Sequence, residues 1–277
     1  MSNFDLYKEW IEGHFERINK EKKKQPQVDL PKEKQKKIEL SFSGAKFLGE
    51  DWGKEIHEKV QAKYGKFEAI SKIVYHEKEK IVKGTTPFYV VAVNEFLPEG
   101  MRTATQADLE KILKGNILKL EGNWEDSALV WRSNQEPNEY LANDVYSQFK
   151  ARGITLNEGT PYVIPLFSLK LREDTQSEHK LAFDLTDVTL KNYFEAPILN
   201  SPSQLKFESS DIDEDTGLPK KASEKGSRKL YTRTCYNIIN SGLVGLFLGT
   251  YLDLDSGSGY LAYSSESGRV VCISVQD

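Results

Sequence analysis

Side chains that could carry out catalysis are few and scattered in this 277-residue chain. Its histidines lack both the i, i+4 spacing of a helical metal site and a nucleophile–histidine–carboxylate pattern. We therefore expect all four to be surface residues: His14, His57, His76 and His179. The chain also has no phosphate-binding glycine loop, no dinucleotide-binding glycine pattern and no G-x-S-x-G nucleophile elbow.

Two adjacent carboxylate pairs, Glu50-Asp51 and Glu125-Asp126, are the next candidates for acid–base chemistry. Neighbouring residues on a strand point to opposite faces, so neither pair is placed for shared proton transfer. Catalysis through paired carboxylates is therefore not predicted.

One acidic motif resembles a cation site in its spacing. Asp211, Asp213 and Asp215 alternate along the chain, and alternate carboxylates can converge on Ca²⁺. An EF-hand loop, however, would have Gly and Glu where this chain has Thr216 and Ala222. The pattern favours a solvated acidic turn, with calcium binding as the less favoured alternative.

The cysteine content excludes a disulfide framework and a cysteine-built zinc site. Only Cys235 and Cys272 are present. We expect free buried thiols, and the alternative is a single disulfide between them. No cofactor is predicted.

Composition narrows the class of protein. Hydrophobic residues make up 38% and aromatic residues 11%, which is enough for a sizeable core. The net charge of −4 and the pI near 5.8 argue against a dedicated nucleic-acid binder. No apolar run approaches the ~20 residues that a membrane helix needs, and the N-terminus lacks a signal-peptide pattern. We expect no membrane insertion, and the sequence favours no particular location.

The elements that position any site are expected to be a mixture of helices and strands. We expect an N-terminal helix over 1–24 and a Lys-rich linker up to residue 37, followed by a single domain over 38–277. Apolar spacing predicts helices over 52–64, 105–113 and 140–152 and strands over 38–42, 69–75, 88–96 and 128–131. Residues 160–171 are expected to form an edge or irregular strand because of Pro161 and Pro165. Residues 172–229 are predicted to be a polar insertion that leaves the core. The fold class is therefore α+β.

The C-terminal segment 241–274 is the most informative part of the chain. Ser, Gly, Asp, Tyr and Thr dominate it, yet Leu246, Leu248, Leu252 and Leu254 occupy alternate positions, as on one face of a strand. A buried terminal strand is expected from Arg269 onward. Tyr, Ser, Gly and Asp on the other face are typical of adaptable recognition surfaces. The alternative interpretation is an ordinary edge strand followed by a Ser/Gly-rich loop.

The pattern G-L-V-G-L-F-L-G-T-Y-L-D-L-D-S, followed by Y-L-A-Y-S and S-G-R-V-V, resembles the variable region of diversity-generating retroelement target proteins, closest to the archaeal and candidate-phyla members. In that family a reverse transcriptase mutates adenines of a template copy, which then replaces the 3′ end of the gene. The resemblance implies a C-type lectin-like fold of the formylglycine-generating-enzyme-like subclass. It also implies a non-catalytic, hypervariable protein that binds an unknown macromolecular ligand, a protein or a cell-surface molecule.

The resemblance also implies which positions are exchangeable. Adenine-only mutation of Asn codons never yields Lys, Glu, Gln, Met or Trp. Lys, Gln, Met and Trp are absent from 241–268, as this rule requires, whereas Glu266 does not fit it. The implied packing set is Leu246, Leu248, Leu252, Leu254, Leu261, Val270 and Val271. The implied ligand-facing set is Phe247, Gly249, Thr250, Tyr251, Asp253, Asp255, Ser256, Ser258, Tyr260, Tyr263 and Ser265.

Two other functions stay open at this point. A formylglycine-generating or sulfatase-modifying enzyme would need Cys235 and Cys272 together at a copper site. A calcium-dependent carbohydrate-binding lectin could take its ligands from Asp211, Asp213 and Asp215.

Overall fold

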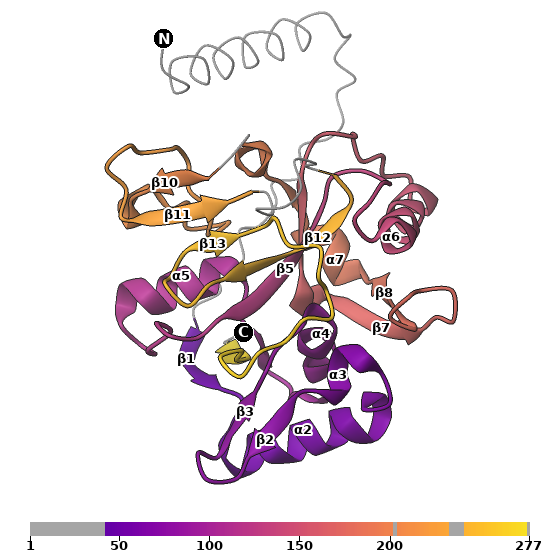
Figure 1. Ribbon diagram of the computed structural model, residues 1–277, viewed down its shortest axis with the longest axis vertical. Helices are drawn as coiled ribbons and strands as arrows, with labels where there is room; N and C mark the ends of the chain where they lie inside the picture. The colour runs from indigo at the N-terminus through magenta and orange to yellow at the C-terminus, as the bar shows by residue number, and fades with distance from the viewer. Residues whose placement is uncertain (1–41, 202–203, 233–240, 276–277) are drawn as a thin grey trace, which may run out of the picture. The chain divides into compact units, whose positions relative to one another are not determined.

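The computed structural model describes residues 42–201, 204–232 and 241–275. The expected N-terminal helix and linker lie outside the described residues, as do His14, Cys235 and nearly all of the strand expected at 38–42. Strands and helices alternate irregularly along the rest of the chain, which confirms the α+β class (Figure 1).

A seven-stranded sheet forms the centre of the described domain. Its strand order is β10-β11-β13-β12-β5-β6-β9, and every pairing is antiparallel except that of β11 with β13. The strands are β5 (Glu125–Trp131), β6 (Tyr162–Pro165), β9 (Phe194–Glu195), β10 (Leu205–Phe207), β11 (Arg228–Tyr231), β12 (Leu243–Leu248) and β13 (Leu254–Asp255).

The C-terminal strand belongs to a second, three-stranded sheet. β14 (Val271–Val275) lies between β1 (Phe42–Phe47) and β4 (Met101–Thr103) and is antiparallel to both. The other strands of the described residues form two antiparallel pairs: β2 (Val74–His76) with β3 (Ile81–Lys83), and β7 (Leu169–Glu173) with β8 (Leu181–Leu185). The segment between β12 and β14 therefore connects the two larger sheets.

The three helices expected from the sequence are confirmed with small boundary differences. They are α2 (Glu50–Tyr64), α5 (Gln106–Gly115) and α6 (Glu139–Ala151). Thr105 begins α5 as part of a capping box with Asp108, which satisfies free N–H groups of the first turn. The remaining helices are α3 (Glu68–Ser71), α4 (Pro87–Phe96), α7 (Asp187–Asn192) and the 3₁₀ turns η1 (Leu166–Ser168), η2 (Pro197–Asn200) and η3 (Ser209–Asp211). None of the described helices is both long enough and apolar enough to span a bilayer.

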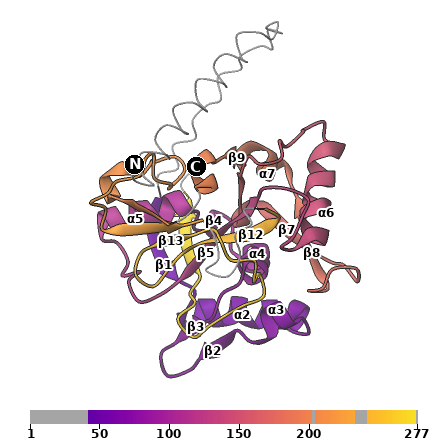
Figure 2. The same cartoon turned by 45° about the horizontal axis from the view of Figure 1, so that its top comes forward.

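The strand predicted over 88–96 is wrong, because this segment is the helix α4. Phe88 to Val93 are all buried, and α4 packs between the seven-stranded sheet and α2 in both views (Figures 1 and 2). A helix that is apolar on every side has no 3.6-residue pattern, so its sequence looks like a buried strand. The strand predicted over 69–75 is also wrong at its start, which belongs to α3.

Residues 160–229 are more integrated than expected. The segment 160–171 is irregular, as one alternative predicted, because η1 separates β6 from β7. β6 lies between β5 and β9, so it is not an edge strand. The polar insertion predicted over 172–229 is wrong as a departure from the core, because Phe183 and Phe207 are fully buried. Phe183 belongs to the short apolar strand β8 and Phe207 ends β10, and both strands pack into the cores although the residues around them are mostly polar.

Two hydrophobic cores lie on opposite faces of the central strand pair. Leu129, Trp131 and Leu243 enter the core around α4, whereas Val130 and Leu246 enter the core that contains α5 side chains. Side chains alternate between the faces of a strand, so β5 and β12 supply both cores. The backbone that precedes the C-terminal loops is therefore buried on both sides.

Candidate functional site

The predicted single strand through residues 246–254 is interrupted by a turn. β12 ends at Leu248, the chain reverses through Gly249–Leu252, and β13 returns so that Leu254 pairs with Leu248. Gly249 N donates to Asp253 O at 2.7 Å, and Leu252 has a left-handed φ of 63°. Leu252 is consequently half-buried, unlike the fully buried Leu246, Leu248 and Leu254.

The other expected packing residues, Leu261, Val270 and Val271, are buried as well. The tyrosines behave in the opposite way: Tyr251, Tyr260 and Tyr263 are 85%, 77% and 58% exposed. Large aromatic side chains in water contribute little to folding. The C-terminal segment thus separates buried aliphatic residues from exposed aromatic ones.

One member of the implied ligand-facing set is not a surface residue. Ser256 is fully buried, and its Oγ accepts a hydrogen bond from Arg132 Nη2 at 3.1 Å, so the expectation that it lies at the surface is wrong. Asp255 is half-buried, accepts from Gly257 N at 2.7 Å, and burial raises the pKa of its carboxyl to about 6.

The rest of the set is partly accessible. Asp253 is half-buried and accepts from Lys229 N at 2.8 Å through Oδ1, so one of its carboxylate oxygens has a structural role. The remaining half-buried members are Phe247, Gly249, Thr250, Ser258 and Ser265.

An aromatic row links β12 to the C-terminal loop. The Trp124 ring lies 5.1 Å from Phe247 and 5.6 Å from Tyr263, the second contact being edge-on. Trp124 also exchanges backbone hydrogen bonds with Ser267 and Arg269. Trp124 is not among the residues expected from the sequence, since a lone tryptophan outside the C-terminal segment carries no signal of its contacts.

A buried ion pair holds the turn that presents Tyr251. Arg228 Nη1 and Nη2 donate to the two carboxylate oxygens of Glu110 at 2.7 Å each, and Arg228 Nε donates to Leu252 O at 2.6 Å. A bidentate arginine–carboxylate pair is geometrically specific. These contacts hold the turn against α5 and β11, beside a depression of about 750 Å³.

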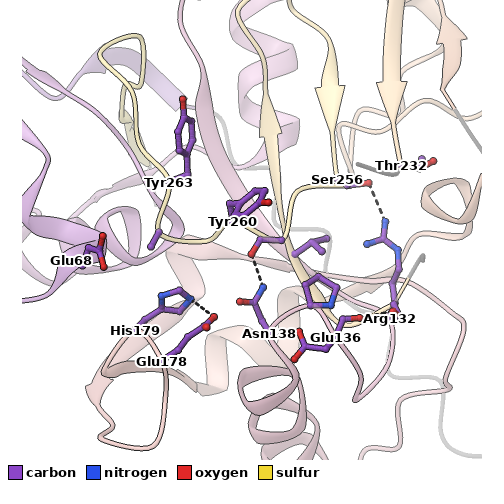
Figure 3. A pocket seen from close by; sticks show the side chains of 16 residues that line it. Glu68, Arg132, Glu136, Asn138, Glu178, His179, Thr232, Ser256, Tyr260 and Tyr263 are labelled. Atoms are coloured by element: carbon purple, nitrogen blue, oxygen red, sulfur yellow. Dashed lines mark hydrogen bonds and ion pairs between the residues drawn. The ribbon is translucent and has the colours of Figure 1, made fainter. Parts of the chain in front are cut away.

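The second concavity, which we call the tyrosine cleft, has a volume of about 770 Å³. Tyr260 and Tyr263 contribute one wall, together with buried Ser256 at the base. The other walls come from distant parts of the chain, including Glu68, Glu136, Asn138, Glu178 and His179 (Figure 3). The sequence did not indicate any of these five residues as part of this site.

Two histidines differ from the expectation that all are surface residues. His57 is buried against Tyr89, whose hydroxyl lies 2.7 Å from His57 Nδ1, and burial lowers the pKa of His57 to about 4. His179 is half-buried, and desolvation lowers its pKa below 6.5. Both rings are therefore mainly neutral at pH 7.

Two buried carboxyls directly follow Trp124 along the chain. Glu125 and Asp126 follow Trp124 on β5, and burial raises their pKa values to about 9 and about 7. Both oxygens of Glu125 and one oxygen of Asp126 have no hydrogen-bond partner. Glu125 is only 1% exposed, so it cannot reach a ligand at the surface.

The acidic motif forms a turn. Asp213 Oδ1 accepts hydrogen bonds from the backbone N–H groups of Asp215 and Thr216 and from the Thr216 hydroxyl, at 3.0–3.1 Å. Lys221 lies 3.3 Å from Asp211. Within the part of the chain that the structure describes, no three His, Cys, Asp or Glu side chains are grouped to hold a metal ion.

Cys272 is a free, buried thiol on β14, as expected, and burial raises its pKa to about 12. A thiol of this kind is a poor nucleophile, since the thiolate is the reactive form. Cys235 lies outside the described residues, so the expected state of that thiol stays a prediction.

Comparison of the chain with protein-family models, with curated proteins and with solved structures gives no match.

Proposed function

We propose that this chain is a non-catalytic binding protein whose C-terminal loops form an exchangeable recognition surface diversified by a retroelement. One observation carries the proposal: the aliphatic side chains of the C-terminal segment are buried, while Tyr251, Tyr260 and Tyr263 are largely exposed. Substitution at exposed positions usually changes stability by no more than about 0.5 kcal/mol. The segment can therefore vary at its surface without loss of the fold.

The scaffold beneath this surface supports the same proposal. β12 is buried from both faces, β14 is held between two strands, and the Glu110–Arg228 pair fixes the intervening turn. A preorganised backbone reduces the entropy lost on binding. We include in the proposal a C-type lectin-like fold, for which the α+β architecture is the coarser support.

Exposed tyrosines are suited to binding a macromolecule. Tyrosine supplies a large amphipathic contact area with few rotatable bonds, and aromatic anchors carry much of the energy of protein interfaces. We expect Tyr251, Tyr260 and Tyr263 to be such anchors. The ligand in the proposal is a protein or cell-surface molecule.

The genetic part of the proposal is tested by nucleotide sequence. We expect a near-copy of the 3′ end of the gene close to a reverse-transcriptase gene, with mismatches confined to adenines of the template copy. The mismatched codons should include those of the three exposed tyrosines. Mismatches spread over all four bases would refute diversification by a retroelement.

The physical part is tested with a display library. Randomised codons at 251, 260 and 263 should leave most clones folded, and selection against unrelated proteins should yield specific binders. A matched library at the buried Leu246, Leu248 and Leu254 should give few folded clones. Equal losses of folded clones in the two libraries would contradict the separation of scaffold and surface.

A further inference from the structure

We propose that the tyrosine cleft binds the basic side chain of a protein partner, with arginine as the best fit. The inference rests on the proposed function and specifies the chemistry of its ligand. It starts from residues outside the C-terminal segment, since Glu68, Glu136 and Glu178 all border the cleft (Figure 3).

The charge of the cleft is negative. Among the described residues of its lining, the one arginine is Arg132, which is buried at the base, where Nη2 donates to Ser256 Oγ and Leu199 O at 3.1 Å each. His179 adds little positive charge because desolvation lowers its pKa below 6.5. The three glutamates therefore border a lining that, as far as the structure describes it, has no exposed cation.

Two of these carboxylates are available to a ligand. Among the described residues, no hydrogen bond or ion pair engages the Glu136 side chain. Glu178 Oε1 lies 3.1 Å from the ring nitrogen Nε2 of His179, and its side chain is 69% exposed. Glu68 already pairs with Lys72 at 2.7 Å on the surface of α3, so it contributes mainly to the field.

The aromatic wall suits a flat cation. Tyr260 and Tyr263 present their rings to solvent at the cleft. A guanidinium group can stack on a tyrosine face while its N–H groups donate to a carboxylate. An anionic partner such as nucleic acid would instead be repelled by the glutamates.

The loop that carries Tyr260 is fixed in place. Asn138 Nδ2 donates to Gly259 O at 2.8 Å and to Leu243 O at 2.7 Å, which ties the loop to the start of β12. A Cβ at Gly259 would lie 2.6 Å from the Pro137 side chain, so the Gly259 backbone packs closely against the proline ring. The cleft is therefore largely formed before a ligand arrives.

The arrangement combines a constant and a variable part. Glu68, Glu136 and Glu178 lie outside the exchangeable segment, whereas Tyr260 and Tyr263 lie within it. Variants of this surface would then share a preference for basic partners, and the aromatic positions would set which basic partner is bound.

The test uses the full chain and short peptides in an NMR titration. The probes are acetyl-Gly-Arg-Gly-Arg-Gly-amide and the same peptide with citrulline, a neutral analogue of similar shape, in place of arginine. We expect the arginine peptide to bind at least about tenfold more tightly, with shift changes at residues that border the cleft. Glu136→Gln and Glu178→Gln should each weaken binding by about threefold or more.

Matched variants separate the contributions of the tyrosine ring and of the cleft carboxylates to binding. Tyr260→Ala should weaken binding, whereas Tyr260→Phe keeps the ring face and should retain it. Glu121→Gln removes an exposed carboxylate that does not border the cleft and should leave binding unchanged. Equal affinity for the two peptides, or unchanged affinity in both cleft glutamine variants, would overturn the assignment.

The outcome is separable from that of the proposed function. An adenine-specific template copy without arginine preference would retain the proposed function and reject this cleft assignment. Arginine preference without a template copy would retain this cleft assignment and reject diversification by a retroelement.

Discussion

Glu125 provides the sharpest test of the scaffold beneath the recognition surface. Its side chain is 1% exposed, neither carboxylate oxygen has a hydrogen-bond partner, and burial raises its pKa from 4.5 to about 9. In the unfolded chain the same group ionises near its ordinary pKa. At neutral pH folding must therefore take up a proton, which destabilises the native state.

The size of the effect follows from the two pKa values. Between pH 5 and pH 8 the folded carboxyl stays protonated and the unfolded one is ionised. The contribution of Glu125 to stability then falls by about 1.36 kcal/mol per pH unit, or about 4 kcal/mol over this range. Glu125→Gln cannot ionise, so its stability relative to wild type should rise by about 4 kcal/mol from pH 5 to pH 8.

Urea unfolding at the two pH values, followed by tryptophan fluorescence, measures this difference. Any pH-independent cost of the amide cancels when the two pH values are compared. Glu121→Gln, at an exposed position on the preceding loop, is the matched control and should show no such trend. A change below about 1 kcal/mol for Glu125→Gln would mean that the buried carboxyl is ionised or paired in the folded protein.

Three further outcomes are expected. Leu254→Ala should lower the free energy of unfolding by about 2–5 kcal/mol because it leaves a cavity in a core. Tyr251→Ala, at an exposed position, should change it by no more than about 0.5 kcal/mol, and urea unfolding of both variants measures the difference. Arg228→Met should lower the free energy of unfolding by about 3–5 kcal/mol, because it leaves the buried Glu110 carboxylate without its arginine partner. The double variant that also carries Glu110→Met should recover much of this loss in the same assay. Cys272 should resist iodoacetamide at pH 8 until the protein is unfolded, because its thiol is buried and its pKa is raised to about 12. Mass spectrometry of the peptide that carries Cys272 measures the labelling. Rapid labelling of the native protein would contradict the buried position of this thiol.

Local signals identified several elements before their contacts were known. The 3.6-residue spacing of apolar side chains predicted α2, α5 and α6, and the capping residue Thr105 marked the start of α5. The segment of α4 resembles a strand in its sequence because the helix is buried on every side and so lacks a polar face. Thr86 as N-cap and Pro87 in the first turn are nevertheless helix signals that the sequence contains.

The C-terminal segment contains a turn that the alternation of its side chains does not predict. Alternation identified Leu246, Leu248 and Leu254 as buried, but it also predicted that Leu252 packs in the same way, whereas Leu252 is only half-buried. Alternation cannot report a chain reversal, and the turn at Gly249–Leu252 changes which side chains reach solvent.

Periodicity and composition are local properties, so the α+β class, the aliphatic anchors of the C-terminal segment and the tyrosines between them could be inferred from the chain alone. That Trp124 completes an aromatic row, and that glutamates from α3 and from two separate loops border the tyrosine cleft, depends on tertiary contacts. These groups lie far apart along the chain, and no short-range pattern encodes a contact that depends on how two sheets and their loops pack together.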